Sequence, residues 1–217
     1  MSSFSANIKL FLVCIFVVLL SACSDSVPQI SEPNMSIVLD YQKENDFPDT
    51  RLSVFVMPVS EAGRVSYIDV EHIDTGISWK IEDPIIITGS KNYRAGSSFL
   101  MPPPDENFPK GMYKICYTDL AERSTESEFN LSYKNAFLSM TAESIRRYAN
   151  QSEISEKIAV YSERDGKGIL LYYGELKDGW SARKKIIEEY NKAMSIRTVY
   201  ELQGQVVLCI LPPENIR

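Results

Sequence analysis

Apolar and polar residues alternate through residues 35–133 of this chain. In RLSVFVM, Leu52, Val54 and Val56 occupy every second position, and SEFNLSY repeats the pattern with Phe129 and Leu131. A period of two with one apolar face is typical of an antiparallel strand with one buried side. Pro, Gly, Asn and Asp separate these segments at the spacing of a β-sandwich. The predicted strands are 36–41, 51–57, 65–72, 77–82, 85–88, 111–118 and 126–133.

After residue 133 the pattern becomes mixed. Thr141 is suited to cap a short helix that ends near residue 150. ERDGK then separates two apolar segments, a hairpin signal. A helix from Asp178 or Ser181 to about Met194 has an apolar stripe, and a second hairpin with a Gln-Gly turn follows. The predicted strands are 157–162, 168–176, 197–202 and 205–211, in the order ββαββ.

Two of these segments, ILLYY and VVLCIL, are apolar at every position. Continuous apolar runs are typical of strands that are covered on both faces. One helix covers only one face of a small sheet. We therefore expect the other face to pack on the N-terminal half or on a partner protein.

The stretch FPKGMYKICYTDLAE, residues 108–122, resembles the penultimate strand of bacterial immunoglobulin-like and fibronectin-III-like domains. Glu122 departs from the motif, which usually has Gly there. The resemblance implies an immunoglobulin-like sandwich over 35–133 and a tyrosine corner, in which the Tyr113 hydroxyl bonds nearby backbone. The alternation then directs Tyr113, Ile115 and Tyr117 to the core and Cys116 outward. The motif residues are Pro109, Gly111, Tyr113, Ile115, Tyr117, Asp119 and Ala121.

The first 22 residues have the three zones of a secretory signal peptide. A short polar segment ends at Lys9, residues 10–20 are all apolar, and Ser21 and Ala22 are small. A membrane-spanning helix needs about 20 apolar residues, so this run is too short to cross a bilayer.

The residues that end this segment, Leu20, Ser21, Ala22 and Cys23, resemble the lipobox of bacterial lipoproteins. The resemblance implies cleavage between Ala22 and Cys23, a diacylglycerol thioether on Cys23 and acylation, for example by palmitate, of the new amino group. Two or more acyl chains anchor a protein stably. Ser24, in place of Asp, implies the outer membrane by the enterobacterial sorting rule. Residues 23–34 are then a flexible tether before the sandwich (35–133) and the helix plus α+β unit (134–217).

The charge of the chain limits its partners. It has 23 Lys and Arg against 29 Asp and Glu, a net charge of −6. An acidic surface disfavours nucleic acid and flat electrostatic binding to anionic lipid. We therefore expect contact with the membrane through the N-terminal lipid, and an envelope protein as the partner.

Cys116 and Cys209 are the cysteines that remain beyond the signal and the lipidation site. Outside the cytoplasm two such thiols can form a disulfide. The alternative is two separate buried thiols that pack as small apolar residues. Two distant cysteines and the single His72 do not have the spacing of metal ligands, so no metal site is expected.

No catalytic signature or cofactor motif stands out. His72 ends a predicted strand without a nucleophile motif and is expected to be a solvated or hydrogen-bonded polar residue. Adjacent carboxylates are expected to be solvated, and several aromatics are candidates for a binding surface. The sequence therefore favours a non-catalytic binding or assembly module, with a surface adhesin or a carboxylate hydrolase as alternatives. The carboxylate pairs are Glu82/Asp83, Asp105/Glu106 and Glu188/Glu189, and the aromatics are Trp79, Tyr93, Tyr172, Tyr173 and Trp180.

Overall fold

The computed structural model describes residues 27–31, 33–59, 64–88, 93–152, 154, 156–164, 167–204 and 206–217, with backbone only at 164 and 167. The predicted signal peptide, the cleavage site between Ala22 and Cys23 and the lipidation of Cys23 lie outside the described residues.

The protein is mainly β, with two sheets and two α-helices in the part described. The larger sheet has the order β10-β9-β11-β12-β1-β2-β6-β5, with β13 paired to β11, and the smaller has the order β4-β3-β7-β8. Strands of the larger sheet are β1 (Asn34–Asp40), β2 (Asp49–Val56), β5 (Ile85–Thr88), β6 (Tyr93–Leu100), β9 (Glu156–Arg164), β10 (Lys167–Glu175), β11 (Ser195–Leu202), β12 (Val207–Ile210) and β13 (Glu214–Asn215). Strands of the smaller sheet are β3 (Val65–His72), β4 (Ser78–Ile81), β7 (Gly111–Asp119) and β8 (Ser124–Leu131).

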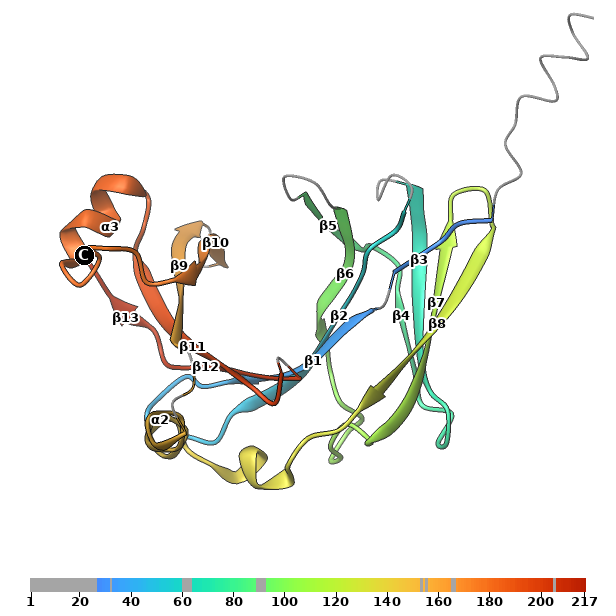
Figure 1. Ribbon diagram of the computed structural model, residues 1–217, viewed down its shortest axis with the longest axis horizontal. Coiled ribbons are helices and arrows are strands. Elements are labelled where there is room, and N and C mark those ends of the chain that lie inside the picture. Colours follow the sequence, from blue (N-terminus) through green and yellow to red (C-terminus); the bar gives the residue numbers. More distant parts are fainter. Residues whose placement is uncertain are drawn as a thin grey trace, which may run out of the picture.

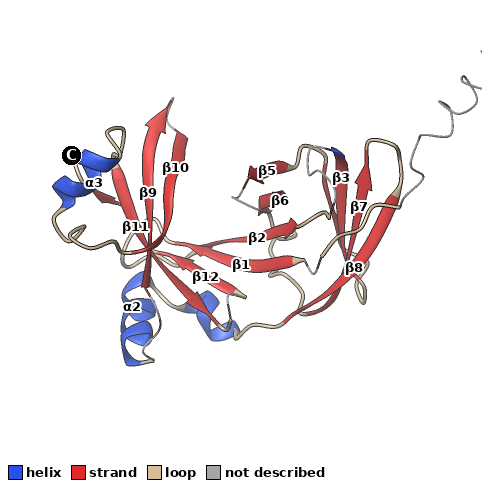
Figure 2. Ribbon diagram, turned by 45° about the horizontal axis from the view of Figure 1, so that its top comes forward, coloured by secondary structure: helices blue, strands red, loops and turns tan. Residues whose placement is uncertain are grey.

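The larger sheet curls. Figure 1 shows β9 and β10 rising at one end and β5 and β6 at the other, with β1, β2, β11 and β12 between them. The smaller sheet stands beyond β5 and β6, and Figure 2 shows the same arrangement from a second direction. Buried residues of both sheets, such as Val54 on β2 and Ile115 on β7, belong to one hydrophobic core.

The C-terminal half joins the larger sheet through its strand edge. β1 pairs in parallel with β12, for example Ile37 with Val207, and antiparallel with β2. The predicted order ββαββ is present as β9, β10, α3, β11 and β12. One continuous sheet, however, links the two halves of the chain. Hydrogen bonds between strands therefore join the C-terminal sheet to the N-terminal half, in place of face-to-face packing, which was one of the two expected arrangements.

The two continuous apolar runs have different outcomes. VVLCIL forms the central strand β12, where Val207 and Cys209 are fully buried. ILLYY forms β10, which lies at an end of the sheet, and Leu170 is 52% exposed and Tyr173 43% exposed. The expectation that ILLYY is covered on both faces was wrong, because Leu171 and Tyr172 pack against the cluster that contains Trp180 and Ile186, whereas Leu170 and Tyr173 remain largely uncovered.

Strand β6 was not predicted, since its sequence YRAGSSFL does not alternate. Gly96 explains why the strand forms there. An added Cβ at Gly96 would lie 2.0 Å from the Val54 carbonyl oxygen, so only glycine allows β6 to approach β2 this closely. The β2–β6 pairing also shifts register between Leu52 and Val54.

The helices cover the convex side of the larger sheet. α2 (Ala142–Gln151) begins as predicted, with the Thr141 side chain accepting from the Ser144 N–H at 3.3 Å, and its buried residues join the main core. A 3-10 helix, η2 (Asn135–Ser139), precedes it. α3 (Arg183–Glu189) is shorter than predicted. Its extension to Met194 is prevented because the Met194 N–H bonds the Tyr161 carbonyl of β9.

Strand β7 confirms the side-chain directions predicted for residues 113–117. Tyr113, Ile115 and Tyr117 are fully buried, and the Tyr113 hydroxyl donates to the Pro109 carbonyl at 2.7 Å. Glu122 has φ 58°, in the left-handed region that favours glycine. This conformation explains why the motif usually has Gly at that position.

Candidate functional site

The curled sheet holds a cavity of about 630 Å³ on its concave side. Its walls come from strands at both ends of the sheet: Phe99 lies on β6, whereas Tyr161 and Leu170 lie on β9 and β10. The volume is within the usual range of small-molecule and peptide-side-chain sites. The lining residues are Asp40, Gln42, Arg51, Ser98, Phe99, Tyr161, Ser162, Glu163, Gly168, Leu170, Met194, Ser195, Arg197, Pro213 and Asn215.

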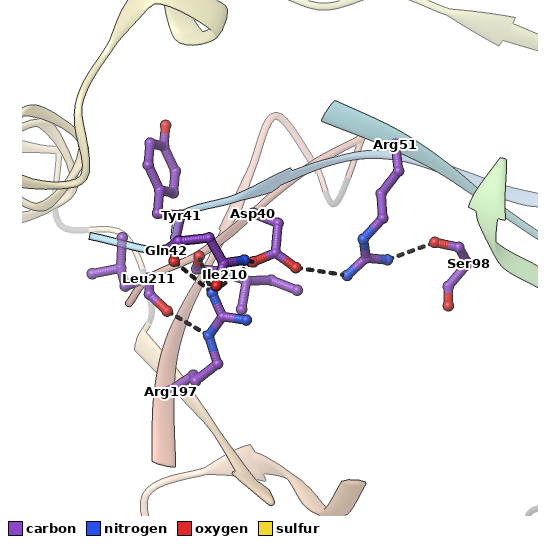
Figure 3. A network of polar contacts seen from close by, with 8 residues as sticks. All are labelled: Asp40, Tyr41, Gln42, Arg51, Ser98, Arg197, Ile210 and Leu211. Carbon is purple, nitrogen blue, oxygen red and sulfur yellow. Dashed lines mark hydrogen bonds and ion pairs between the residues drawn. The ribbon is translucent and has the colours of Figure 1, made fainter. Parts of the chain in front are cut away.

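Three charged side chains, which we call the Asp40 group, form the floor of this cavity: Asp40, Arg51 and Arg197. Asp40 Oδ1 accepts from Arg197 Nη2 at 2.6 Å, and Asp40 Oδ2 accepts from Arg51 Nη2 at 3.3 Å. Figure 3 shows the carboxylate between the two guanidinium groups. The group therefore carries one excess positive charge.

The Asp40 group is recessed. The side chains of Asp40, Arg51 and Arg197 are only 15%, 14% and 13% exposed. Removing charges from water costs free energy that the ion pairs only partly return. The group is nevertheless still open to the cavity, because all three residues line it.

Arg197 also donates hydrogen bonds to backbone carbonyls just after the ends of β1 and β12. Its Nε donates to the Leu211 carbonyl at 2.6 Å, and its Nη2 donates to the Tyr41 carbonyl at 2.7 Å. Arg51 donates from Nη1 to the Ser98 carbonyl at 2.5 Å, which links β2 to β6. The floor is thus held by strands from both halves of the chain.

Apolar side chains surround this charged floor. Phe99 is 67% exposed, and its ring centroid lies 4.6 Å from the Arg51 guanidinium carbon. Leu170 and Met194 are 52% and 39% exposed. Tyr161 completes the lining, and burial raises the pKa of its phenol, so the hydroxyl stays protonated and able to donate.

Further along the same sheet face lies a second polar group. Glu201 is four residues beyond Arg197 on β11, so the two side chains share a face. Glu201 pairs with Lys157 at 2.8 Å and accepts a hydrogen bond from the Tyr173 hydroxyl. Burial and this carboxylate raise the pKa of Tyr173. The concave face is therefore polar over a wide area, in contrast to the opposite face under α3, where Ile158, Val160 and Ile196 pack.

Cys116 and Cys209, the candidate disulfide pair, are both free thiols in the structure. Cys116 lies half-buried on the side of β7 opposite to its core residues, between Asp69 and Glu126 of the adjacent strands. Cys209 is fully buried on β12 of the other sheet, and burial raises the pKa of its thiol to about 12. The two side chains therefore belong to different sheets and different surroundings.

His72 is a buried, hydrogen-bonded residue. Its Nδ1 lies 2.9 Å from the Thr75 hydroxyl and its Nε2 lies 3.0 Å from the Lys110 carbonyl. Its ring also contacts Tyr113 edge-on, with 4.9 Å between centroids. It lies on β3, outside the lining of the cavity.

The adjacent carboxylates lie in separate places and are all exposed. Glu82 and Asp83 occupy the turn between β4 and β5, and Asp105 and Glu106 lie in the loop after β6. Glu188 and Glu189 end α3, where Glu189 pairs with Lys177. The structure brings none of these pairs to the cavity.

The candidate aromatics do not form one surface. Trp79 packs on Phe108 and Tyr113 of the N-terminal half and donates to the Met101 carbonyl at 2.8 Å. Tyr172 and Trp180 pack around the Lys177 ammonium, which lies 4.7 Å from each ring centroid. The Lys177 side chain therefore already occupies the space next to these two rings.

Comparison of the chain with protein-family models, with curated proteins and with solved structures finds no match. Across the described ranges, no helix is long and apolar enough to span a bilayer. In the same residues, no group of three or more His, Cys, Asp or Glu side chains could hold a metal ion.

Sequence reasoning did not single out the Asp40 group. The available signal was a charged residue within a strand: Asp40 directly after MSIVL and Arg197 within SIRTVYEL. Asp40 and Arg197 are separated by 157 positions. Their pairing follows from the β1–β12 contact, which periodicity does not reveal.

Proposed function

We propose that this protein is a lipid-anchored, non-catalytic binding or assembly module of a bacterial cell envelope, and that it binds its partner in the concave face of the larger sheet. The anchor rests on the match of Leu20 to Cys23 to the lipobox. The binding role rests on one observation above the others: the 630 Å³ cavity with a recessed charged floor and an exposed apolar rim.

An immunoglobulin-like sandwich is the fold that we propose for residues 35–133. Its support is the tyrosine-corner bond from Tyr113 to Pro109 and the common core shared by β1, β2 and β6 with β3 and β7. Such sandwiches commonly serve as rigid supports for binding surfaces. Fold analogy alone is weak support for function, so the proposal depends on the cavity.

A cavity with a polar floor and an apolar rim suits binding of a partner side chain or small ligand. Apolar area at the rim supplies affinity, and a few fixed polar groups supply orientation. Phe99, Leu170 and Met194 are exposed around the Asp40 group, which gives the surface both properties.

Photo-crosslinking in intact cells tests this role. A photoreactive phenylalanine is placed at Phe99 on the rim, and a control at Leu120, which follows β7 on the smaller sheet; the exposed fractions are 67% and 69%. We expect a discrete protein or ligand adduct from position 99 and none from position 120. Equal adducts from both positions, or none from position 99, would contradict the proposal.

The anchor is tested separately with Cys23→Ala. The variant should lose radiolabelled palmitate and leave the membrane fraction, or remain as the uncleaved precursor. Mass spectrometry of the wild-type N-terminal peptide should show a lipid-modified Cys23. Unchanged mass and membrane extraction in the variant would contradict the lipoprotein assignment.

A further inference from the structure

Within the Asp40 group, positive charge exceeds negative charge. Two guanidinium groups share one carboxylate, which leaves one net positive charge at the floor of the cavity. Glu163, an exposed residue of β9, is a second carboxylate of the cavity lining, so the excess of positive charge is confined to the recessed floor. In a chain of net charge −6, a recessed excess of positive charge calls for a local explanation.

Several hydrogen-bond donors at this floor have no acceptor among the described residues. A guanidinium has five N–H donors. Neither Arg51 Nε nor Arg197 Nη1 has a hydrogen-bond acceptor among the described residues. Figure 3 shows no dashed line at one terminal nitrogen of Arg197. The hydroxyl of Tyr161 likewise has no hydrogen bond to the described residues.

Arg51 is the side chain best placed to meet a ligand. Arg197 uses Nε and Nη2 on the carbonyls of Tyr41, Ile210 and Leu211, which fixes the floor. Within the described part of the chain, Arg51 makes two hydrogen bonds, and its guanidinium rests against the ring of Phe99. An aromatic ring that holds a guanidinium in place reduces the entropy lost when the guanidinium binds an anion.

We propose that the cavity binds a single carboxylate carried on an apolar segment, such as a peptide terminus or an acidic side chain next to apolar residues, with Arg51 as its principal partner. A carboxylate accepts two parallel N–H bonds from a guanidinium and cancels one excess charge. The neighbouring Phe99, Leu170 and Met194 then cover the apolar part of the segment. This inference rests on the proposed binding role and specifies the chemistry of the ligand.

The probe for this test is 3-phenylpropionate, with its neutral amide as the matched control. Binding to the full chain in detergent micelles is followed by saturation-transfer NMR. We expect the carboxylate to bind at least tenfold more tightly than the amide. Equal affinities of the two probes would overturn the inference.

Variants of Arg51 locate the site. We expect Arg51→Gln to weaken 3-phenylpropionate binding at least tenfold. Arg51→Lys should weaken binding less, because lysine keeps the positive charge although it lacks the paired N–H donors of the guanidinium. Arg147→Gln removes an exposed cation on α2, 68% exposed, and should change nothing. Near-ultraviolet circular dichroism of each variant verifies that the fold is retained. Equal weakening by Arg147→Gln, or none by Arg51→Gln in a folded variant, would overturn the inference.

A competitor separates a carboxylate site from a general oxyanion site. Dimethyl phosphate carries the same single charge as a phosphodiester of a lipid headgroup. We expect it to displace 3-phenylpropionate only at tenfold or higher concentration, and displacement at equal concentration would contradict carboxylate recognition. If the adduct from position 99 forms in cells while 3-phenylpropionate does not bind, the binding role stands and only the ligand chemistry is wrong.

Discussion

Two groups of charged side chains, one on each sheet, differ in how far they are removed from water. On the outer face of the smaller sheet, Lys114 lies 3.3 Å from Glu71 and 3.9 Å from Glu126, and the three side chains are 39–61% exposed. On the concave face of the larger sheet, the Asp40 group is 13–15% exposed. Each group has one ion pair at 3.3 Å, but the exposure of its side chains is different.

This difference in exposure changes what each ion pair contributes to stability. Exposed ion pairs contribute little to stability because water and salt screen them. Recessed ion pairs are often no better for stability than apolar residues of the same size, because desolvation opposes them. This weak contribution to stability is the reason that we propose a role in recognition for the recessed Asp40 group.

Gly96→Ala should have the largest effect, because it disrupts the wall that makes the Asp40 group recessed. The new Cβ would meet the Val54 carbonyl oxygen at 2.0 Å, so β6 must separate from β2. We expect a loss of about 3 kcal/mol in the free energy of unfolding, measured by urea denaturation. Gly168→Ala is the matched control: its Cβ would meet only Tyr161 at 3.6 Å, and stability should hardly change.

Asp40→Asn should have the second-largest effect on stability, because it removes the carboxylate charge of the recessed Asp40 group. The substitution leaves two guanidinium groups close together without their anion. Loss of one partner of a buried ion pair costs on the order of 3 kcal/mol, and partial exposure places this site at or below that value. Thermal unfolding of the variant and wild type at low and high salt measures this loss of stability. We expect salt to reduce the loss, and a loss that is independent of salt would indicate that charge is not the cause.

Asp119 provides a pH-dependent comparison at the end of β7. Burial by itself raises the pKa of this carboxyl, but hydrogen bonds from Arg123 and from the Ala121 N–H outweigh it and lower the pKa below the ordinary value of 3.8. The stabilisation is therefore present above pH 3.8 and is lost as the pH falls through the lower, folded-state value. Asp119→Asn should be less stable than wild type at pH 7, and the difference should shrink in acid. A difference that stays constant with pH would show that the carboxylate charge is not involved.

Glu71→Gln should have the smallest effect. It removes one anion from the exposed group around Lys114, where solvent screens the interaction. We expect the urea midpoint to stay within experimental error of wild type. A loss as large as that of Asp40→Asn would remove the distinction between the two groups.

The sequence revealed individual strands better than it revealed their arrangement. The bounds predicted for β3 and β5 agree with the structure, and the capping of α2 by Thr141 is confirmed. These features depend on local periodicity and on the side chain at a helix start. β6 was not predicted, because its pairing depends on a close approach at Gly96 rather than on alternation of apolar and polar residues.

The candidate site was beyond the reach of local patterns. It requires the parallel pairing of β1 with β12 and the curl that brings β6 opposite β9 and β10. Both depend on contacts between residues far apart in the chain, such as Asp40 and Arg197. Periodicity predicts which side of a strand is buried, but it does not predict which strands become neighbours.

The most direct test of the recessed charges as a binding site is the yield of crosslinked adduct from one rim position in three backgrounds. The photoreactive residue is placed at Leu170, which is 52% exposed on the wall of the cavity across from Phe99. The backgrounds are wild type, Arg51→Gln in the Asp40 group and Lys114→Gln in the exposed group. We predict an adduct in wild type and Lys114→Gln and its loss in a folded Arg51→Gln variant. Equal yields in all three backgrounds would contradict the claim that the recessed charges carry binding.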